Sequence, residues 1–300
     1  MKRLLIPART HSLIIIVVWI LACSVSGVQA QLLYKISGNS ISRPSYLMAT
    51  NRLCDLALLD SVPNLFSAFG RCRKVVTEFT MQDYEAIAAL RTAALLPDSV
   101  QLRKYYTEDE YREIDEALNL SLGLPLKQLA RMKPAYLTEM YRTALFKQWL
   151  EYDEQQSMES FFQALAEERG MPVVGLDDIG ETMFMLFDRE PLYYQCDELL
   201  RVVRYPERET AQERIILNLY RNGRLTDIAY SIIAPDNRSS ISYSDYQVYK
   251  ARNKEWVKRL RPILLDGDAF IVLDAIYLGG DDGLIHALRN AGYKVKPVNR

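Results

Sequence analysis

Two similar units, one near each end of the chain, constrain the fold more than any other feature of the sequence. The first spans 45–79 and reads as an apolar strand, a corner, a helix, Gly70 and a β-rich strand. The second spans 270–298 and has the same order, with Gly292 between its helix and its last strand. We expect the two strand–corner–helix–strand units to pair in one sheet and to bring their corners together.

The remaining patterns place a large helical insertion between these units. Two further β-rich runs occur at 32–38 and 172–177, and apolar residues at helical spacing dominate the rest, about 81–170 and 189–265. One helix has signals at both ends, since Thr107 and Glu110 form a capping box and Gly123 follows the last periodic residue. We therefore predict an α/β (α+β) fold with a mixed central sheet, built as a single domain over 31–300.

The first thirty residues, 1–30, have the pattern of a secretory signal peptide. A basic start precedes an apolar run at 13–22, and small residues stand before the predicted cleavage site after Ala30. An alternative is a lipoprotein signal, in which Cys23 carries a lipid anchor. No later apolar run approaches about 18 residues, so we expect no transmembrane segment in the mature chain. We predict export to the periplasm or the extracellular space, free or anchored to the cell envelope.

Charge and cysteine content narrow the classes of partner and cofactor. The chain has 37 basic and 38 acidic side chains, and this balance argues against a nucleic-acid partner. Cys54, Cys72 and Cys196 would lie in an oxidising compartment, where either one pair forms and one thiol stays free or all three are buried thiols. Their spacing matches no zinc knuckle.

Histidine is nearly absent, and this excludes several mechanisms. His11 lies in the predicted signal peptide, which leaves His286 as the one histidine of the mature chain. A zinc site with two or three histidines cannot be built. A catalytic triad would need His286 as its base, but we expect that residue in the middle of a helix, as a surface or packing residue. The sequence also has no phosphate-binding P-loop and no dinucleotide-binding glycine motif.

An ordered set of short motifs resembles the TraB/GumN family, which includes the Tiki-type proteases. The resemblance covers nearly the whole mature chain, and the motifs that carry it are Leu33–Asn39, Pro44–Leu47, Glu78, Val174–Asp177, Arg252–Asn253, Leu278–Gly280, Gly283–Leu284 and Ala291–Val295. It implies a G-x-x-H corner in each unit. The paired histidines and an acidic residue would form a divalent-metal site for peptide-bond hydrolysis.

This sequence departs from that pattern at both corners. The first corner reads Ala49-Thr50-Asn51-Arg52 and the second reads Asp274-Ala275-Ile276-Tyr277, so Arg52 and Tyr277 stand in place of the histidines. Asp177 replaces a glutamate of the family. We therefore predict no cofactor, although the resemblance by itself implies a divalent metal.

A set of carboxylates remains, and we take it as the candidate site. Glu78 and Asp177 are the candidate catalytic residues. The candidate ligand-binding residues are Asn51, Arg52, Arg252, Asn253, Asp274 and Tyr277. Structural alternatives stay open: Asp177, Asp281 and Asp282 as helix caps, Tyr277 as a packing residue, and Arg52 as an ion-pair partner of Glu78 that fills the former metal position.

Two functions from different classes follow from these residues. The first is a non-catalytic protein on a hydrolase-like scaffold, which binds a peptide, a glycan or an envelope protein. The alternative is a hydrolase in which Glu78, Asp177 and Asp274 hold an oxygen-preferring metal or act on the substrate directly. A third reading is an interaction module that shares only the fold.

Overall fold

The computed structural model describes residues 31–80, 84–150, 156–233 and 243–299, so the predicted signal peptide and Cys23 lie outside the described residues. Within these ranges a six-stranded mixed sheet has the order β4-β3-β5-β2-β1-β6. Its strands are β1 (Leu33–Ser37), β2 (Ser45–Thr50), β3 (Lys74–Thr77), β4 (Val173–Gly175), β5 (Ala269–Asp274) and β6 (Lys294–Pro297). The predicted fold class, α/β (α+β) with a mixed central sheet, is confirmed.

Four neighbouring strands of the sheet run parallel. β5 pairs in parallel with both β2 and β3, and β3 pairs in parallel with β4. β1 is antiparallel to β2 and to β6. In this register Thr50, the last residue of β2, lies beside Asp274, the last residue of β5. The two corners are therefore adjacent, as the paired units predict, at the carboxyl ends of the parallel strands, where open α/β sheets bind ligands.

The helices of the described residues follow the predicted order along the chain. They are α2 (Leu65–Phe69), α3 (Tyr84–Ala93), α4 (Glu108–Leu122), α5 (Leu126–Leu129), α6 (Pro134–Trp149), α7 (Met158–Glu168), α8 (Ile179–Met183), α9 (Leu192–Arg204), α10 (Pro206–Arg221), α11 (Leu225–Ile233), α12 (Tyr243–Asp266) and α13 (Leu284–Asn290). Shorter helical turns are η1 (Leu56–Ser61), η2 (Leu102–Tyr105), η3 (Phe184–Asp188) and η4 (Ala275–Tyr277).

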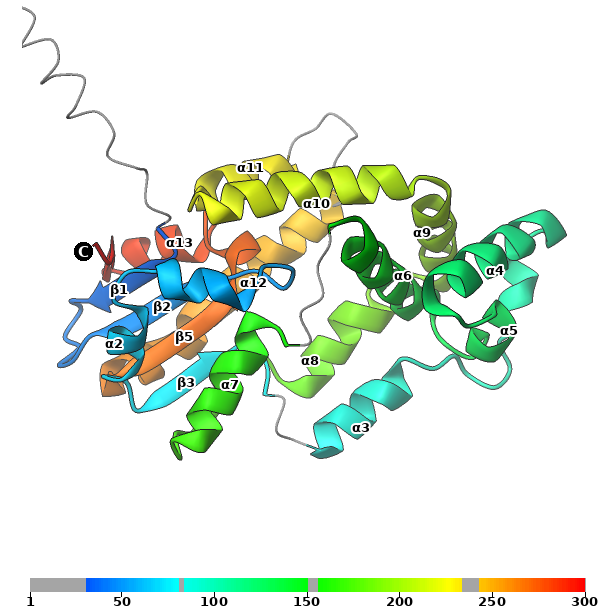
Figure 1. The fold of residues 1–300 in the computed structure, drawn as a ribbon. Coiled ribbons are helices and arrows are strands. Elements are labelled where there is room, and N and C mark those ends of the chain that lie inside the picture. The colour runs from blue at the N-terminus through cyan, green and yellow to red at the C-terminus, as the bar shows by residue number, and fades with distance from the viewer. Residues whose placement is uncertain (1–30, 81–83, 151–155, 234–242, 300) are drawn as a thin grey trace, which may run out of the picture.

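Helices cover both faces of the centre of the sheet (Figure 1). On one face Phe69 of α2 packs edge-on against Phe270 of β5, and Phe162 of α7 packs at a tilt against the same ring, with centroids 5.1 and 5.0 Å apart. α12 lies on the opposite side of the sheet, and α13 packs beside it and against β6 (Figure 1). β5 is buried from Ala269 to Leu273 because it is central and covered on both faces, which explains its uninterrupted apolar run.

Of the inserted helices, α4, α5, α6 and α9 extend away from the sheet, whereas α7 and α12 pack on it (Figure 1). α4 starts with the predicted capping box, in which the Thr107 hydroxyl accepts from the Glu110 backbone N–H and the Glu110 carboxylate accepts from the Thr107 N–H. It ends at Gly123, whose φ of 69° favours glycine. α4, α6 and α9 pack against one another. The apolar side chains of these helices are therefore buried between the helices rather than against the sheet.

Two further expectations concern membranes and thiols. Across the described ranges, no helix combines the length and the apolar character needed to cross a membrane. Cys54, Cys72 and Cys196 are buried and form no disulfide. The second alternative for the cysteines, in which all three are buried thiols, is therefore the one observed.

Candidate functional site

The carboxyl ends of the four parallel strands supply most of the candidate residues. Asn51 and Arg52 follow β2, and Glu78 follows β3. Asp177 comes two residues after β4, and its backbone N–H donates to the Glu78 carbonyl at 2.8 Å. Asp274 ends β5 and leads into η4, which contains Tyr277. Because these strands are parallel, side chains from distant segments gather where the strands end, at the carboxyl end of the sheet.

Arg252 of α12 is the centre of the site. Its guanidinium binds the Glu78 carboxylate, with Nη2 2.9 Å from Oε2, and both Nε and Nη2 contact Oδ2 of Asp177, the former at 2.7 Å. The three side chains are largely buried, with exposed fractions of 14% for Arg252, 18% for Glu78 and 8% for Asp177. A buried carboxylate needs such a partner because desolvation of an isolated charge is costly.

Two more residues of α12 hold the other oxygen of Asp177. Trp256 donates its indole N–H to Oδ1 at 2.7 Å, and Arg259 approaches the same oxygen at 3.5 Å while it binds Glu181 of α8 at 2.6 and 2.7 Å. Residues 252, 256 and 259 share one helix face, since they are four and three positions apart. Sequence reasoning missed Trp256 and Arg259, although this spacing after Arg252 was a signal that could have found them.

Tyr277, at the second corner, turns toward Arg252. Its hydroxyl accepts a hydrogen bond from Nη1 of Arg252, and its ring packs edge-on against Trp256, with centroids 4.9 Å apart. The amide of Asn253 donates to the Tyr277 carbonyl and to the Asp282 carbonyl, both at 3.0 Å. Tyr277 is thus both a packing residue and a hydrogen-bond acceptor inside the site.

Arg52, at the first corner, does not pair with Glu78, so that prediction is wrong. Its Nη1 lies 3.0 Å from Oε2 of Glu139 on α6, and Arg252 takes the Glu78 carboxylate instead. Glu139 also binds Arg142, which contacts Glu198 of α9 at 2.5 Å and Glu209 of α10 at 2.8 Å. The chain folds this way because the inserted helices bring Glu139 to the corner from 87 positions away. No local pattern indicates that contact.

Asn51 and Asp274 close the two corners in the same manner. The Asn51 side-chain oxygen accepts from the Leu53 N–H at 2.9 Å, and the Asp274 carboxylate accepts from the Ile276 N–H at 2.9 Å. Such turns are typical of Asn and Asp. Beside them, the Thr50 hydroxyl donates to the Glu159 carboxylate of α7, a contact that sequence reasoning did not find.

Burial raises the pKa of several groups at this edge of the sheet. The pKa of Glu78 lies above its ordinary value because of burial, although the Arg252 charge acts in the opposite direction. The pKa of Asp274 is well above its ordinary value, through burial and the nearby Glu159 carboxylate. Burial and the Glu78 charge also raise the pKa of Tyr277 well above 10.0, so its hydroxyl stays neutral.

The helix-cap alternatives for the aspartates are wrong. Asp178, rather than Asp177, caps α8 and forms a capping box with Glu181. Gly283 is the N-cap residue of α13, while Asp281 accepts from the Tyr230 hydroxyl and Asp282 pairs with Lys250. Glycine is required at 283 because a Cβ there would lie 2.0 Å from the Gly279 carbonyl oxygen. His286 is exposed on α13, as expected for a surface residue.

The residues present do not fit a divalent-metal site built on histidines. A guanidinium has no lone pair to offer a metal, and a neutral phenol is a poor ligand, so neither Arg52 nor Tyr277 replaces an imidazole. Among the described residues, no three His, Cys, Asp or Glu side chains are arranged to hold a metal ion. The guanidinium and carboxylate groups can instead form ion pairs with one another and hydrogen bonds with a bound molecule at the carboxyl end of the strands.

Comparison with known proteins gives one match. The model of the TraB/PrgY/gumN family matches residues 32–297, which is nearly the whole chain. No curated protein and no solved structure matches.

Proposed function

Because the chain belongs to the TraB/PrgY/gumN family, we propose that it is an exported, non-catalytic binding protein on a metal-hydrolase-like scaffold. Its partner is a peptide, a glycan or another protein of the cell envelope. The observation that carries this proposal is the chemistry of the two corners: Arg52 pairs with Glu139, and the neutral Tyr277 hydroxyl accepts from Arg252.

The charge balance at the site supports the same conclusion. Glu78 and Asp177, which follow the neighbouring parallel strands β3 and β4, share the guanidinium of Arg252. A dication that took these oxygens would have to displace that guanidinium or lie beside its positive charge. Arg252 belongs to the motifs shared with the family, so the features that set this chain apart are Arg52 and Tyr277.

A second candidate function is hydrolysis by carboxyl groups, and the raised pKa values favour it. Glu78 and Asp274 both have pKa values above their ordinary range. A carboxyl group with a raised pKa can act as a general acid, and Asp177, which shares Arg252 with Glu78, would then serve as the base. This candidate predicts that Glu78→Gln abolishes turnover of a peptide substrate without a lower melting temperature.

Metal binding tests the first proposal. The purified protein, Glu78→Ala and the double variant R52H/Y277H are dialysed against Zn²⁺, Mn²⁺, Mg²⁺ and Ca²⁺, and bound metal is measured by elemental analysis. We expect no difference between the wild type and Glu78→Ala, and a gain of bound Zn²⁺ in R52H/Y277H, because two imidazoles then stand at adjacent corners of the sheet.

The control is R52A/Y277F, which removes the same side chains without adding imidazoles and should gain no metal. Near-stoichiometric metal in the wild type, lost in Glu78→Ala, would contradict the proposal and support a metal-dependent hydrolase. Turnover of a peptide panel by the metal-free wild type, lost in Glu78→Gln, would instead support the carboxyl-group hydrolase.

A further inference from the structure

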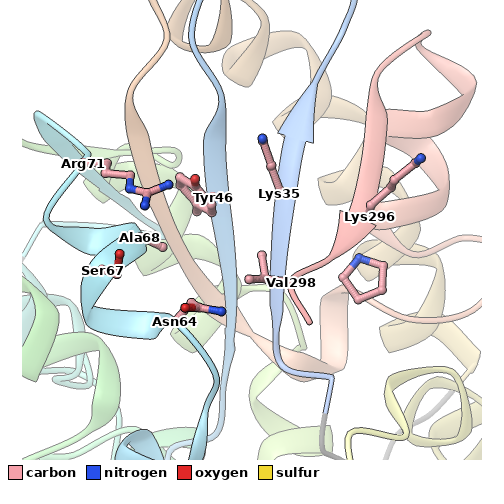
Figure 2. A pocket seen from close by; sticks show the side chains of 9 residues that line it. Lys35, Tyr46, Asn64, Ser67, Ala68, Arg71, Lys296 and Val298 are labelled. Atoms are coloured by element: carbon pink, nitrogen blue, oxygen red, sulfur yellow. The ribbon is translucent and has the colours of Figure 1, made fainter. Parts of the chain in front are cut away.

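A hollow of about 410 Å³ lies at the far side of the sheet from the candidate site, over β1 and β6 (Figure 2). Its floor is a row of directly paired residues that crosses three strands, Tyr46 of β2, Lys35 of β1 and Lys296 of β6. The same row continues to Phe270, which α2 and α7 cover. The hollow therefore opens where the helical cover of this face ends.

Two segments make the walls of this hollow. α2 and its flanking turns contribute Asn64, Ser67 and Arg71 on one side, and the chain after β6 lies on the other. The side chain of Asn64 donates to the Asn299 carbonyl at 3.1 Å, and the Val298 N–H donates to the Leu33 carbonyl at 2.9 Å. The first bond joins the two walls, and the second ties the chain after β6 to β1 in the floor.

Three positive charges line the hollow without compensation. Lys35, Arg71 and Lys296 are exposed, and within the described ranges none of them forms an ion pair. Basic residues close by in the sequence behave differently, since Arg73 binds Asp268 at 3.0 Å and Lys74 binds Asp266. Among the residues that the structure describes, no acidic side chain lines the hollow. An anion entering it would meet only cations and neutral groups.

The register of the strands makes this arrangement unfavourable in the free protein. Lys35 and Lys296 stand directly opposite each other on β1 and β6. Like charges at directly opposed positions of a sheet destabilise it. An anion held between the two ammonium groups would remove the repulsion and add charge-assisted hydrogen bonds.

The spread of the cations indicates the class of anion. Lys35 and Lys296 stand on the adjacent strands β1 and β6, and Arg71 comes from the turn after α2, beyond Tyr46 of β2 (Figure 2). The three cations therefore extend over roughly 10 Å, given the usual spacing between strands. One phosphate group is shorter than that span, whereas two linked phosphate groups can contact all three cations. A phosphate group also carries more negative charge than a carboxylate and has more acceptor oxygens. The neutral side chains of Tyr46, Asn64 and Ser67 leave room for an organic group beside it (Figure 2).

We propose that this hollow binds the diphosphate group of an organic ester, held by Lys35, Lys296 and Arg71. The ester is either a soluble molecule or the headgroup of a lipid-linked diphosphate, since both present the same oxygens. This site is separate from the edge of the sheet that carries Glu78 and Arg252, and it does not depend on the function proposed for that edge.

Binding of inorganic pyrophosphate to the purified protein tests the proposal by calorimetry. We expect saturable binding that weakens as salt is raised. The double variant K35A/K296A should bind at least about tenfold more weakly, because it loses two charge-assisted contacts, and Arg71→Ala should also bind more weakly. Without ligand, K35A/K296A should melt no lower than the wild type, since the opposed charges are gone, and this shows that the variant folds.

The matched control is K104A/K127A, which removes two exposed lysines elsewhere and should bind like the wild type. Phosphatidylcholine vesicles that contain geranylgeranyl diphosphate distinguish the sources. Sedimentation with these vesicles, lost in K35A/K296A, supports a lipid-linked diphosphate, and binding of pyrophosphate alone supports a soluble ester. Absence of saturable pyrophosphate binding, equal binding by K35A/K296A, or tighter binding of the dicarboxylate glutarate would overturn the proposal.

Discussion

The corner after β2 and the corner after β5 begin alike and then diverge. Asn51 and Asp274 each accept a hydrogen bond from the backbone two residues further on, so the local turn is the same. Arg52 then leaves the first corner for Glu139 of the helical insertion, while Tyr277 turns from the second corner into the site. Equivalent positions of two similar units therefore have different partners.

The two sets of partners differ in how far they are buried, and burial decides how much each ion pair contributes to stability. The side chains of Arg52 and Glu139 are 48% and 44% exposed, whereas Arg252 and Asp177 are 14% and 8% exposed. Water screens the first ion pair and already solvates its members. The second pair has lost most of its water, so each member depends on the other. A single substitution is therefore most damaging in the buried cluster around Arg252, which Tyr277 of the second corner joins.

The largest expected effect is that of Arg252→Ala. It leaves Glu78 buried without its cation and Asp177 with only the more distant Arg259, at 3.5 Å, and we expect the free energy of unfolding to fall by about 3 to 5 kcal/mol. Urea unfolding measures this. The control is the triple variant R252A/E78Q/D177N, which removes the orphaned charges and should recover much of the loss. A fall of less than about 1 kcal/mol for Arg252→Ala would mean that the second corner is as well solvated as the first.

A smaller effect is expected for Tyr277→Phe. The ring contacts with Trp256 remain, but Nη1 of Arg252 loses its acceptor, so stability should fall by about 1 to 2 kcal/mol. The same urea experiment measures it. Tyr230→Phe is a matched control, because that exposed hydroxyl donates to Asp281 at a long distance of 3.4 Å and should contribute little. Equal losses in the two variants would show that the Tyr277 hydroxyl has no special place in the site.

The smallest effect is expected for Arg52→Ala, at most about 1 kcal/mol at neutral pH, as for other exposed ion pairs. Its signature is a pH dependence. Partial desolvation raises the pKa of the half-exposed Glu139 carboxylate, but the charges and hydrogen bonds of Arg52 and Arg142 outweigh it and lower the pKa from 4.5 to about 2. A lowered carboxyl pKa stabilises the fold above pH 4.5, and this contribution is lost as the pH falls through about 2.

Thermal unfolding across that range measures the contribution. Melting temperatures of the wild type should fall more steeply with acid than those of Arg52→Ala, because the variant has less of this stabilisation to lose. Superimposable acid profiles of the two proteins would contradict an ion pair between Arg52 and Glu139 in solution.

Much of the fold could be predicted because its signals are local. The six β-rich runs each became a strand, and Thr107, Glu110 and Gly123 mark the ends of α4 as expected. Periodicity and capping connect residues only a few positions apart, so the sequence displays them directly. The edge of the sheet that gathers Glu78, Asp177, Asp274 and Tyr277 also followed from the paired units.

The partners of these residues could not be predicted in the same way. The pairing of Glu78 with Arg252 instead of Arg52 depends on where α12 and α6 lie relative to the sheet. The cap assigned to Asp177 failed by one position, because Asp178 has the backbone angles of an N-cap residue and Asp177 is drawn to Trp256 and Arg252. Two aspartates in succession look equivalent in a sequence, and only packing distinguishes them.

The two strand–corner–helix–strand units, the helical insertion and the identity of Arg52 and Tyr277 at the corners could all be read from the sequence, because they depend on residue type and short-range spacing. The tertiary structure alone decided which arginine neutralises Glu78, and that Lys35, Lys296 and Arg71 share one hollow without a counter-charge. Ion pairs act over a few ångströms, and the segments that they join are brought within that distance only when the helices pack on the sheet.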